Sequence, residues 1–154
     1  RSKGRKCSRQ RGTRMKYYVV IDTNVLVSAL MKPESIPGVI LEEALSGRIM
    51  PLLNSEILDE YEEVLSRRKF KFDHRDIRVA IDGLVRRALF VDAGPVDAYI
   101  PDPKDVVFYA VTMEKRNESD EEAYLVTGNQ KHFPIRPFVV TPRQMVDILN
   151  EGDS

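Results

Sequence analysis

The sequence predicts an α/β fold in which helices cover a parallel β-sheet. Short apolar segments, typical of buried strands, alternate along the chain with longer segments of helical periodicity, which is the pattern of successive β-α-β units. The 154 residues suit a single domain, and 42% hydrophobic and 31% charged residues are ordinary for a globular protein. No apolar run approaches the roughly 20 residues of a membrane helix, so we expect no membrane-spanning segment.

The N-terminal part of the domain predicts one strand and two helices. Tyr17–Ile21 is a continuous run of β-branched and aromatic residues, which predicts a strand buried on both faces. A first helix is expected over residues 25–31, with Asn24 near its N-cap. A second is expected over Ile36–Ser46, between a capping serine and a terminating glycine.

The middle of the chain predicts two strands and a set of charged helices. Met50–Leu53 is the second predicted strand, and Ser55 is expected to cap a helix over Glu56–Arg68. Apolar residues recur at helical spacing in Asp73–Leu89, which predicts one or two further helices. Leu89–Val91 is the third predicted strand.

The C-terminal part predicts a loop, two strands and two helices. A proline-containing loop, Gly94–Pro103, precedes a helix over Asp105–Lys115, and strands are expected at Tyr124–Thr127 and Phe138–Val140. The segment Thr141–Gln144 has the cap, proline and glutamine of a helix start. No G-x-G-x-x-G or Walker A loop is present, so the phosphate cradle of a nucleotide-binding fold is missing.

The formal net charge of zero is the sum of two unlike parts. Seven of the 24 basic residues and none of the 24 acidic residues lie in residues 1–14, which leaves 17 basic against 24 acidic residues from Met15 onward. We expect this basic arm to be disordered when alone, and residues 15–154 to form the domain. Three interpretations of the arm stay open. It binds RNA phosphates electrostatically, it folds back on the acidic domain, or it is a vector-derived or upstream extension before Met15.

Acidic and amide side chains follow the predicted strands, where open parallel sheets form their sites. Asp22 follows the first strand, and Thr127 and Asn129 lie at the end of the fourth, so Asp22 and Asn129 would face one crevice if these strands were neighbours. A buried carboxylate needs a partner, and a metal ion is one. The alternative is that Asp22 or Asn24 only caps the first helix.

Two more acids are candidates for the same crevice. Glu60 and Glu62 border opposite flanks of the apolar stripe of their helix, so helical geometry leaves both open, beside a merely solvated acidic face. Asp102 and Asp105 open the next helix; capping and the helix dipole explain one of them, and Asp105 is the candidate for the crevice.

This set of acids suits metal-assisted phosphodiester hydrolysis. Carboxylate and amide oxygens bind Mg²⁺ or Mn²⁺, and three acids without a cation would repel one another. The nucleophile would be water activated by the metal rather than a side chain. The only cysteine, Cys7, excludes a disulfide framework, and two distant histidines, His74 and His132, argue against a histidine cage.

Taken together, four segments resemble the PIN domain, the nuclease fold of many toxins of toxin–antitoxin systems and of some RNA-processing enzymes. They are VVIDTNVLVSAL (Val19–Leu30), SEILDEYEEVL (Ser55–Leu65), DPKDVVFYAV (Asp102–Val111) and LVTGNQKHF (Leu125–Phe133). The resemblance covers Met15 to about Asn150 and looks closest to the toxin-component subgroup. It implies a three-layer α/β/α fold with a five-stranded parallel sheet in the order 3-2-1-4-5.

The resemblance also assigns site residues. It implies that Asp22, Glu60 and Asp105 bind metal, choosing Glu60 over Glu62, and that Asn129 stands where many PIN domains have a fourth acid. A neutral amide there can hold a metal-bound water but adds no charge for a second metal ion. Supporting roles are expected for Thr23, Asn24, Ser28, Asp102 and Thr127.

The expected function is that of a cytoplasmic, Mg²⁺- or Mn²⁺-dependent endoribonuclease. The resemblance implies an RNA substrate, a toxin held inactive by an antitoxin peptide in the acidic crevice, and a homodimer. Two alternatives stay open: a housekeeping RNA-processing nuclease, and an inactive scaffold that binds RNA or protein, which Asn129 motivates. Lys131 and His132 either contact an RNA phosphate or decorate a surface turn.

Overall fold

The computed structural model describes residues 17–118 and 122–152, and the predicted basic arm lies outside the described residues. Five parallel strands form one sheet in the predicted order β3-β2-β1-β4-β5. The central strand β1 pairs with β2 through Val19 and Pro51, and with β4 through Val19 and Tyr124. The strands are β1 (Tyr17–Ile21), β2 (Ile49–Leu53), β3 (Leu89–Phe90), β4 (Ala123–Val126) and β5 (Val139–Val140).

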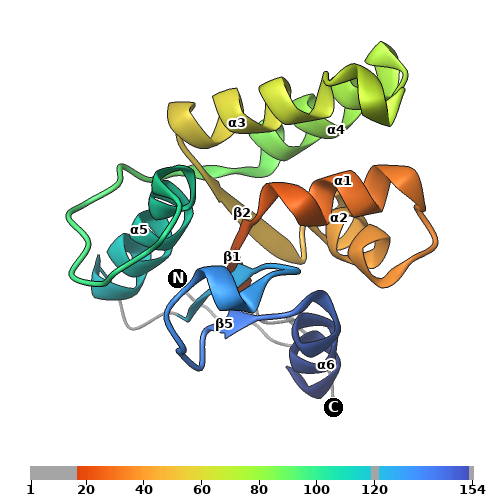
Figure 1. The fold of residues 1–154 in the computed structure, drawn as a ribbon. Coiled ribbons are helices and arrows are strands. Elements are labelled where there is room, and N and C mark those ends of the chain that lie inside the picture. The colour runs from red at the N-terminus through yellow and green to blue at the C-terminus, as the bar shows by residue number, and fades with distance from the viewer. Residues whose placement is uncertain (1–16, 119–121, 153–154) are drawn as a thin grey trace.

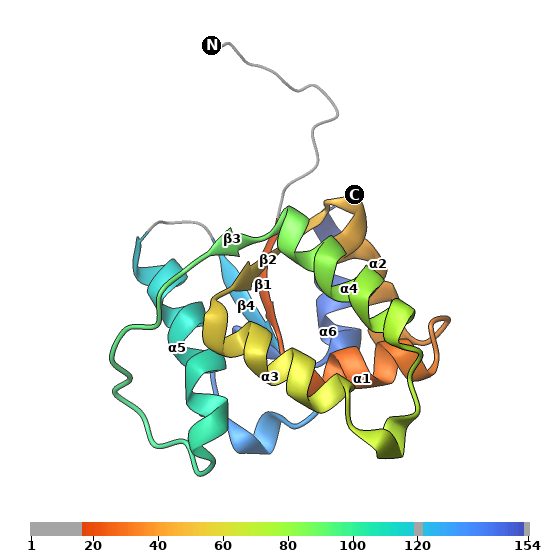
Figure 2. The same cartoon turned by 90° about the horizontal axis from the view of Figure 1, so that it is seen from above.

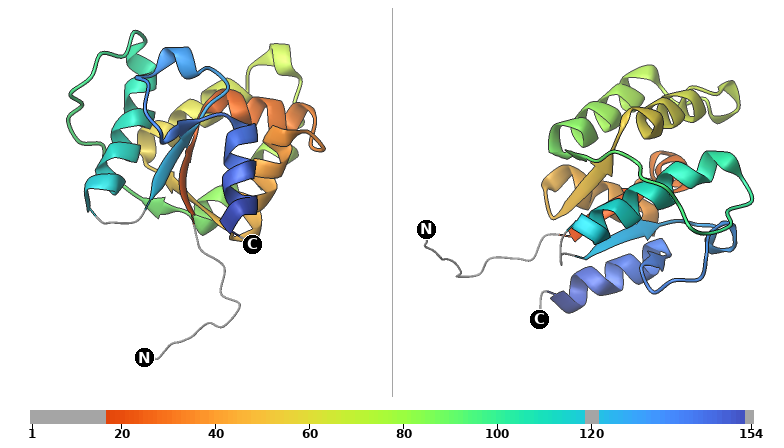
Figure 3. Two further views of the ribbon diagram at one scale, coloured as in Figure 1. Left: turned by 90° about the horizontal axis from the view of Figure 1, so that it is seen from below. Right: turned by 90° about the vertical axis from the view of Figure 1, so that its left-hand side faces the viewer.

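Helices cover both faces of the sheet, which confirms the three-layer fold. Figure 1 labels the elements, and Figure 2 shows α5 on one face, α1, α2, α4 and α6 on the other, and α3 between α5 and α1. Figure 3 shows α6 packed beside α2. The helices are α1 (Thr23–Met31), α2 (Ile36–Ser46), α3 (Ser55–Leu65), α4 (His74–Arg87), α5 (Pro103–Glu118) and α6 (Pro142–Gly152). No helix among the described residues is long and apolar enough to cross a membrane.

Two predicted helix starts are wrong by a few residues. Asp22 rather than Asn24 caps α1, since its carboxylate accepts a hydrogen bond from the Thr23 amide, and α1 begins at Thr23. Asn54 rather than Ser55 caps α3, because its side chain accepts from the Ile57 amide at 2.9 Å. In both cases an earlier polar side chain already satisfies an amide of the first turn.

The end of α3 and both ends of α5 also differ from the prediction. α3 ends at Leu65 rather than Arg68, because Arg67 has extended backbone angles, and a separate 3₁₀ turn, η1 (Arg68–Phe70), follows. α5 begins at Pro103, before the predicted Asp105, because Asp102 accepts a hydrogen bond from the Lys104 amide at 2.9 Å. It continues to Glu118, past the predicted Lys115.

Other predicted helix signals are confirmed. Ser35 caps α2 and Gly47 ends it with a φ of 103°, the left-handed conformation that favours glycine. Thr141 and Gln144 form a reciprocal capping box at the start of α6, with hydrogen bonds of 3.1 and 2.9 Å. The segment predicted as one or two helices forms the single helix α4, which Asp73 caps and which ends at Arg87, before β3 begins at Leu89.

The hydrophobic core lies on both faces of β1, and this packing fixes the position of the carboxyl end of the strand. Val19, Val20 and Leu125 are fully buried, as expected for central strands of a parallel sheet. The carboxyl ends of β1 and β4 are side by side, since Ile21 pairs with Val126. The residues that follow these two strands are therefore held together by the sheet itself.

Candidate functional site

Asp22 is a buried carboxylate at the end of β1, with only 6% of its surface exposed. Its Oδ1 accepts a hydrogen bond from the Thr23 amide at 2.8 Å. Its Oδ2 accepts from the Thr127 hydroxyl at 2.7 Å and from the Asn24 side-chain amide at 3.3 Å. A carboxylate offers about four lone-pair positions, so these three donors leave one position on Oδ1 without a donor among the described residues. Asp22 therefore caps α1 and can also bind a cation.

Hydrogen bonds connect the turn after β4 to Asp22 and Asn24. The fully buried Thr127 donates to Asp22 and accepts a hydrogen bond from the Asn129 amide at 3.0 Å. The Gly128 amide donates to the Asn24 side chain at 3.1 Å. Asp22, Asn24, Thr127 and Asn129 are thus brought together, as the neighbouring ends of β1 and β4 predicted.

Asp105 lies in the first turn of α5 and is mostly buried, with 16% of its side chain exposed. Its Oδ2 is buried and accepts no hydrogen bond. The Nδ1 atom of His132 lies 3.5 Å from that oxygen. Burial, followed by the charges of Asp22 and Asp102, raises the pKa of Asp105 to about 6, which His132 partly opposes.

Asp22 and Asp105 share an excess of negative charge. Burial also raises the pKa of Asp22, despite the hydrogen bonds from Thr127 and Thr23 that lower it. Glu60 adds to the charge that raises the pKa of Asp105. Three acids therefore act on one region, and a cation there would stabilise their ionised forms.

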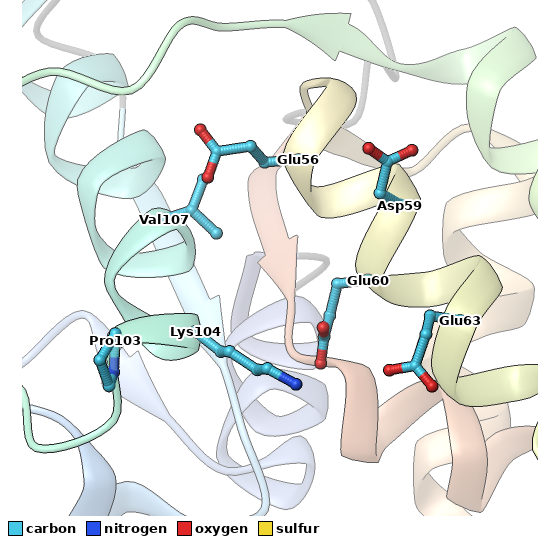
Figure 4. Close-up of a pocket in the computed structure, with 7 residues that line it drawn as sticks. All are labelled: Glu56, Asp59, Glu60, Glu63, Pro103, Lys104 and Val107. Carbon is cyan, nitrogen blue, oxygen red and sulfur yellow. The ribbon is translucent and has the colours of Figure 1, made fainter.

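Glu60 lines a pocket of about 350 Å³ between α3 and α5, with Glu63 and Lys104 among its walls. In Figure 4 the ammonium end of Lys104 points across this pocket toward the carboxylates of Glu60 and Glu63. Glu62 instead contacts Arg78 of α4 at 3.5 Å. The structure thus separates the two glutamates that helical geometry left open, and places Glu60 on the side of α5.

Ser28 lies in a different pocket from Glu60. It is exposed on α1 and lines a second pocket, of about 220 Å³, together with Asn24, Gly128 and Asn129. Asp102 caps α5 and lies in an exposed position, so it reaches the site through its charge on Asp105.

This arrangement matches one known family. The PIN domain family model matches residues 18–131, which is most of the chain. The chain belongs to the PIN domain family. No curated protein and no solved structure matches it significantly. PIN domains are generally nucleases, and they usually use divalent metal ions.

The residues of this PIN domain fit a divalent cation in part. As the side chains stand, no three His, Cys, Asp or Glu residues among the described ranges form a group that could hold an ion. However, Asp105 has a buried oxygen without a donor, and Asp22 has an open position on Oδ1. Mg²⁺ is commonly bound through one or two carboxylates, with waters and substrate phosphates completing the shell. The donor set fits such a site.

Two features of this site were not found from the sequence. Tyr61 was placed only in the apolar stripe of its helix, but its buried hydroxyl donates to the Ile21 carbonyl at 2.6 Å and so fastens α3 to the end of β1. Burial, followed by the charge of Asp22, raises the pKa of this hydroxyl, so it stays a donor. The second feature is the approach of His132 to Asp105.

Proposed function

We propose that this PIN domain is a Mg²⁺- or Mn²⁺-dependent endoribonuclease. The observation that carries the proposal is the pair of buried carboxyl groups, Asp22 and Asp105, whose pKa values are both raised and one of which has an oxygen without a donor. Buried acids with raised pKa values, gathered at the edge where parallel strands end, are typical of catalytic sites. RNA as the substrate is inferred from the resemblance to toxins and RNA-processing members of the family.

Asp22 and Asp105 would hold the cation, with Glu60 facing them from α3. A bound divalent cation supplies charge neutralisation at the phosphate and lowers the pKa of water, which provides the nucleophile. Thr127 and Asn24 bind Oδ2 of Asp22, and Oδ1 accepts only the Thr23 amide, which leaves one lone-pair position on Oδ1 for the cation. Lys104, in the pocket beside Glu60, offers a positive charge for the phosphate backbone of the substrate.

We further propose that the protein is the toxin of a toxin–antitoxin pair. The pocket beside the site is lined by four acids, which suits a basic side chain from a partner peptide. Such a peptide would cover Glu60 and inhibit cleavage. Inhibition of RNA cleavage by the product of a small neighbouring reading frame tests this role, and the absence of such a frame favours a housekeeping RNA-processing nuclease. We expect a homodimer on family precedent, which light scattering tests.

The main experiment measures RNA cleavage by the wild-type protein and by Asp22→Asn, with Mg²⁺ or Mn²⁺ and with chelator. Asn keeps the size of Asp22 and removes its charge. We expect metal-dependent cleavage by the wild type and at least a hundredfold slower cleavage by the variant. Removing one group that stabilises the transition state typically costs about 10²–10³ in rate. Asp147→Asn, an exposed position on α6, is the matched control and should cleave normally.

Two results would contradict the proposal. Equal cleavage by the wild type and Asp22→Asn would show that the activity does not use this carboxylate. Absence of cleavage with both metals, in a protein that still binds RNA, would instead support the inactive scaffold that Asn129 motivated.

A further inference from the structure

The turn that carries His132 is anchored on both sides of the site. It begins where the Asn129 amide donates to Thr127, and it forms a 3₁₀ helix, η2 (Gln130–His132). The His132 amide donates to the Asn129 carbonyl at 3.0 Å. This hydrogen bond closes the turn and holds the backbone of His132 beside that of Asn129. Phe133, which is 5% exposed, holds the far end of the turn in the core.

The separation between His132 and Asp105 is that of two ligands on one ion. The distance between Nδ1 and Oδ2 is 3.5 Å, and this buried oxygen accepts no hydrogen bond in the structure. Metal–nitrogen and metal–oxygen bonds of roughly 2.0–2.2 Å place neighbouring donor atoms about 3.0–3.5 Å apart. A cation can therefore sit between these two atoms with little movement of either side chain. His132 also lies near enough to Asp22 to lower the pKa of that carboxyl group, so both acids and the imidazole face one region.

We propose that His132 is a nitrogen ligand of the divalent cation, shared with Asp105, and that it biases the site toward Mn²⁺ over Mg²⁺. The inference rests on the proposed function. It adds His132 as a ligand of the cation beside Asn129, whose neutral side chain supplies no charge. Imidazole binds transition metals better than it binds Mg²⁺, which prefers oxygen ligands. An all-oxygen site would accept Mg²⁺ readily, whereas a site with one imidazole gains affinity for Mn²⁺.

The sequence provides a matched control, because His74 and His132 are its only two histidines. His74 is exposed at the first residue of α4, on a different element from the acids. The test is pulsed electron paramagnetic resonance on the Mn²⁺-loaded full chain, which detects the coupling of an imidazole ¹⁴N bound to Mn²⁺. We expect this coupling in the wild type and in His74→Gln, and its loss in His132→Gln. Circular dichroism confirms that the variants fold.

Calorimetric titration gives the second readout. His132→Gln should weaken Mn²⁺ binding by about tenfold, the lower range for loss of a group at a metal site, and change Mg²⁺ binding by less than about threefold, because Mg²⁺ prefers oxygen ligands. Mn²⁺ bound by the wild type without nitrogen coupling would overturn the ligand role, and equal losses for both metals would overturn the preference for Mn²⁺. Either result leaves the proposed function intact. Binding of neither Mn²⁺ nor Mg²⁺ by the wild type would overturn both.

Discussion

Thr127→Val tests whether the end of β4 orients Asp22. Thr127 and valine have nearly the same shape, so the change removes one hydroxyl from a fully buried position. That hydroxyl donates to the Asp22 carboxylate at 2.7 Å. A hydrogen bond to a charged group contributes about 1.5–3 kcal/mol. The Asn129 amide, which also bonds to this hydroxyl, lies on an exposed residue and can bond to water instead. The expected loss of unfolding free energy is therefore about 2 kcal/mol.

Thr112→Val is the matched control for that variant. Thr112 is equally buried, but its hydroxyl donates at 2.9 Å to the Phe108 carbonyl, within its own helix. Loss of this neutral bond should cost less than about 1 kcal/mol. Urea unfolding followed by circular dichroism measures both variants, and the slope of the transition should be unchanged.

The pH dependence has a definite sign. The Thr127 hydroxyl lowers the pKa of Asp22, so its stabilising effect is present when Asp22 is ionised and is lost as the pH falls through that pKa. The gap between the wild type and Thr127→Val should therefore shrink in acid. Mn²⁺ affinity should fall by about 10–100-fold, because the hydroxyl holds a ligand of the cation in place. The reasoning is refuted if Thr127→Val costs no more than Thr112→Val and binds Mn²⁺ normally.

Three further predictions concern the acids and the packing of α2. The pKa of Asp105 is raised from 3.8 to about 6, so its ionisation lowers the free energy of unfolding above about pH 6, and this cost is relieved as the pH falls. In metal-free urea titrations the wild type should therefore gain stability relative to Asp105→Asn between about pH 7 and pH 4.5. A constant difference between the two would contradict this. Asn129→Asp should lower stability without metal by like-charge repulsion and increase Mg²⁺ affinity in calorimetry; an unchanged affinity would place this position outside the site. A Cβ at Gly38 would lie 1.9 Å from the Pro33 carbonyl oxygen, so Gly38→Ala should cost about 2 kcal/mol in thermal unfolding. Gly83→Ala meets only the movable Leu45 methyl and should cost much less, so equal losses would argue against the described packing.

The central strands and their order could be predicted because their residues leave few alternatives. Tyr17–Ile21 is apolar throughout, which is typical only of a strand buried on both faces or of a short buried helix segment. The edge strands β3 and β5 lie where they were predicted, but each has two residues, one fewer than the prediction gave. The predicted start of α1 was wrong because Asp and Asn are equally good N-cap residues, so the sequence could not decide between Asp22 and Asn24. Burial of Asp22 beside Thr127, 105 residues later, decides between them.

The site could be predicted where the sheet positions it. Asp22 and Asn129 follow adjacent parallel strands, so topology alone brings them together. Glu60 and Glu62 could not be separated by helical geometry, because the residue that engages Glu62 is Arg78 on the next helix. For His132 the sequence could not decide between a contact to an RNA phosphate and an exposed position in a surface turn. A one-turn 3₁₀ helix is too short to show a periodicity in the sequence.

The most direct test of the account is the position of a bound cation. Anomalous diffraction from crystals soaked in Mn²⁺ locates the ion without reference to activity. The account predicts a strong peak within bonding distance of Asp22 and Asp105, on the side of Oδ1 of Asp22 that Thr127 and Asn24 leave open. A peak on other acids, or no peak at a saturating Mn²⁺ concentration, would contradict the central claim that these two carboxylates form a metal site.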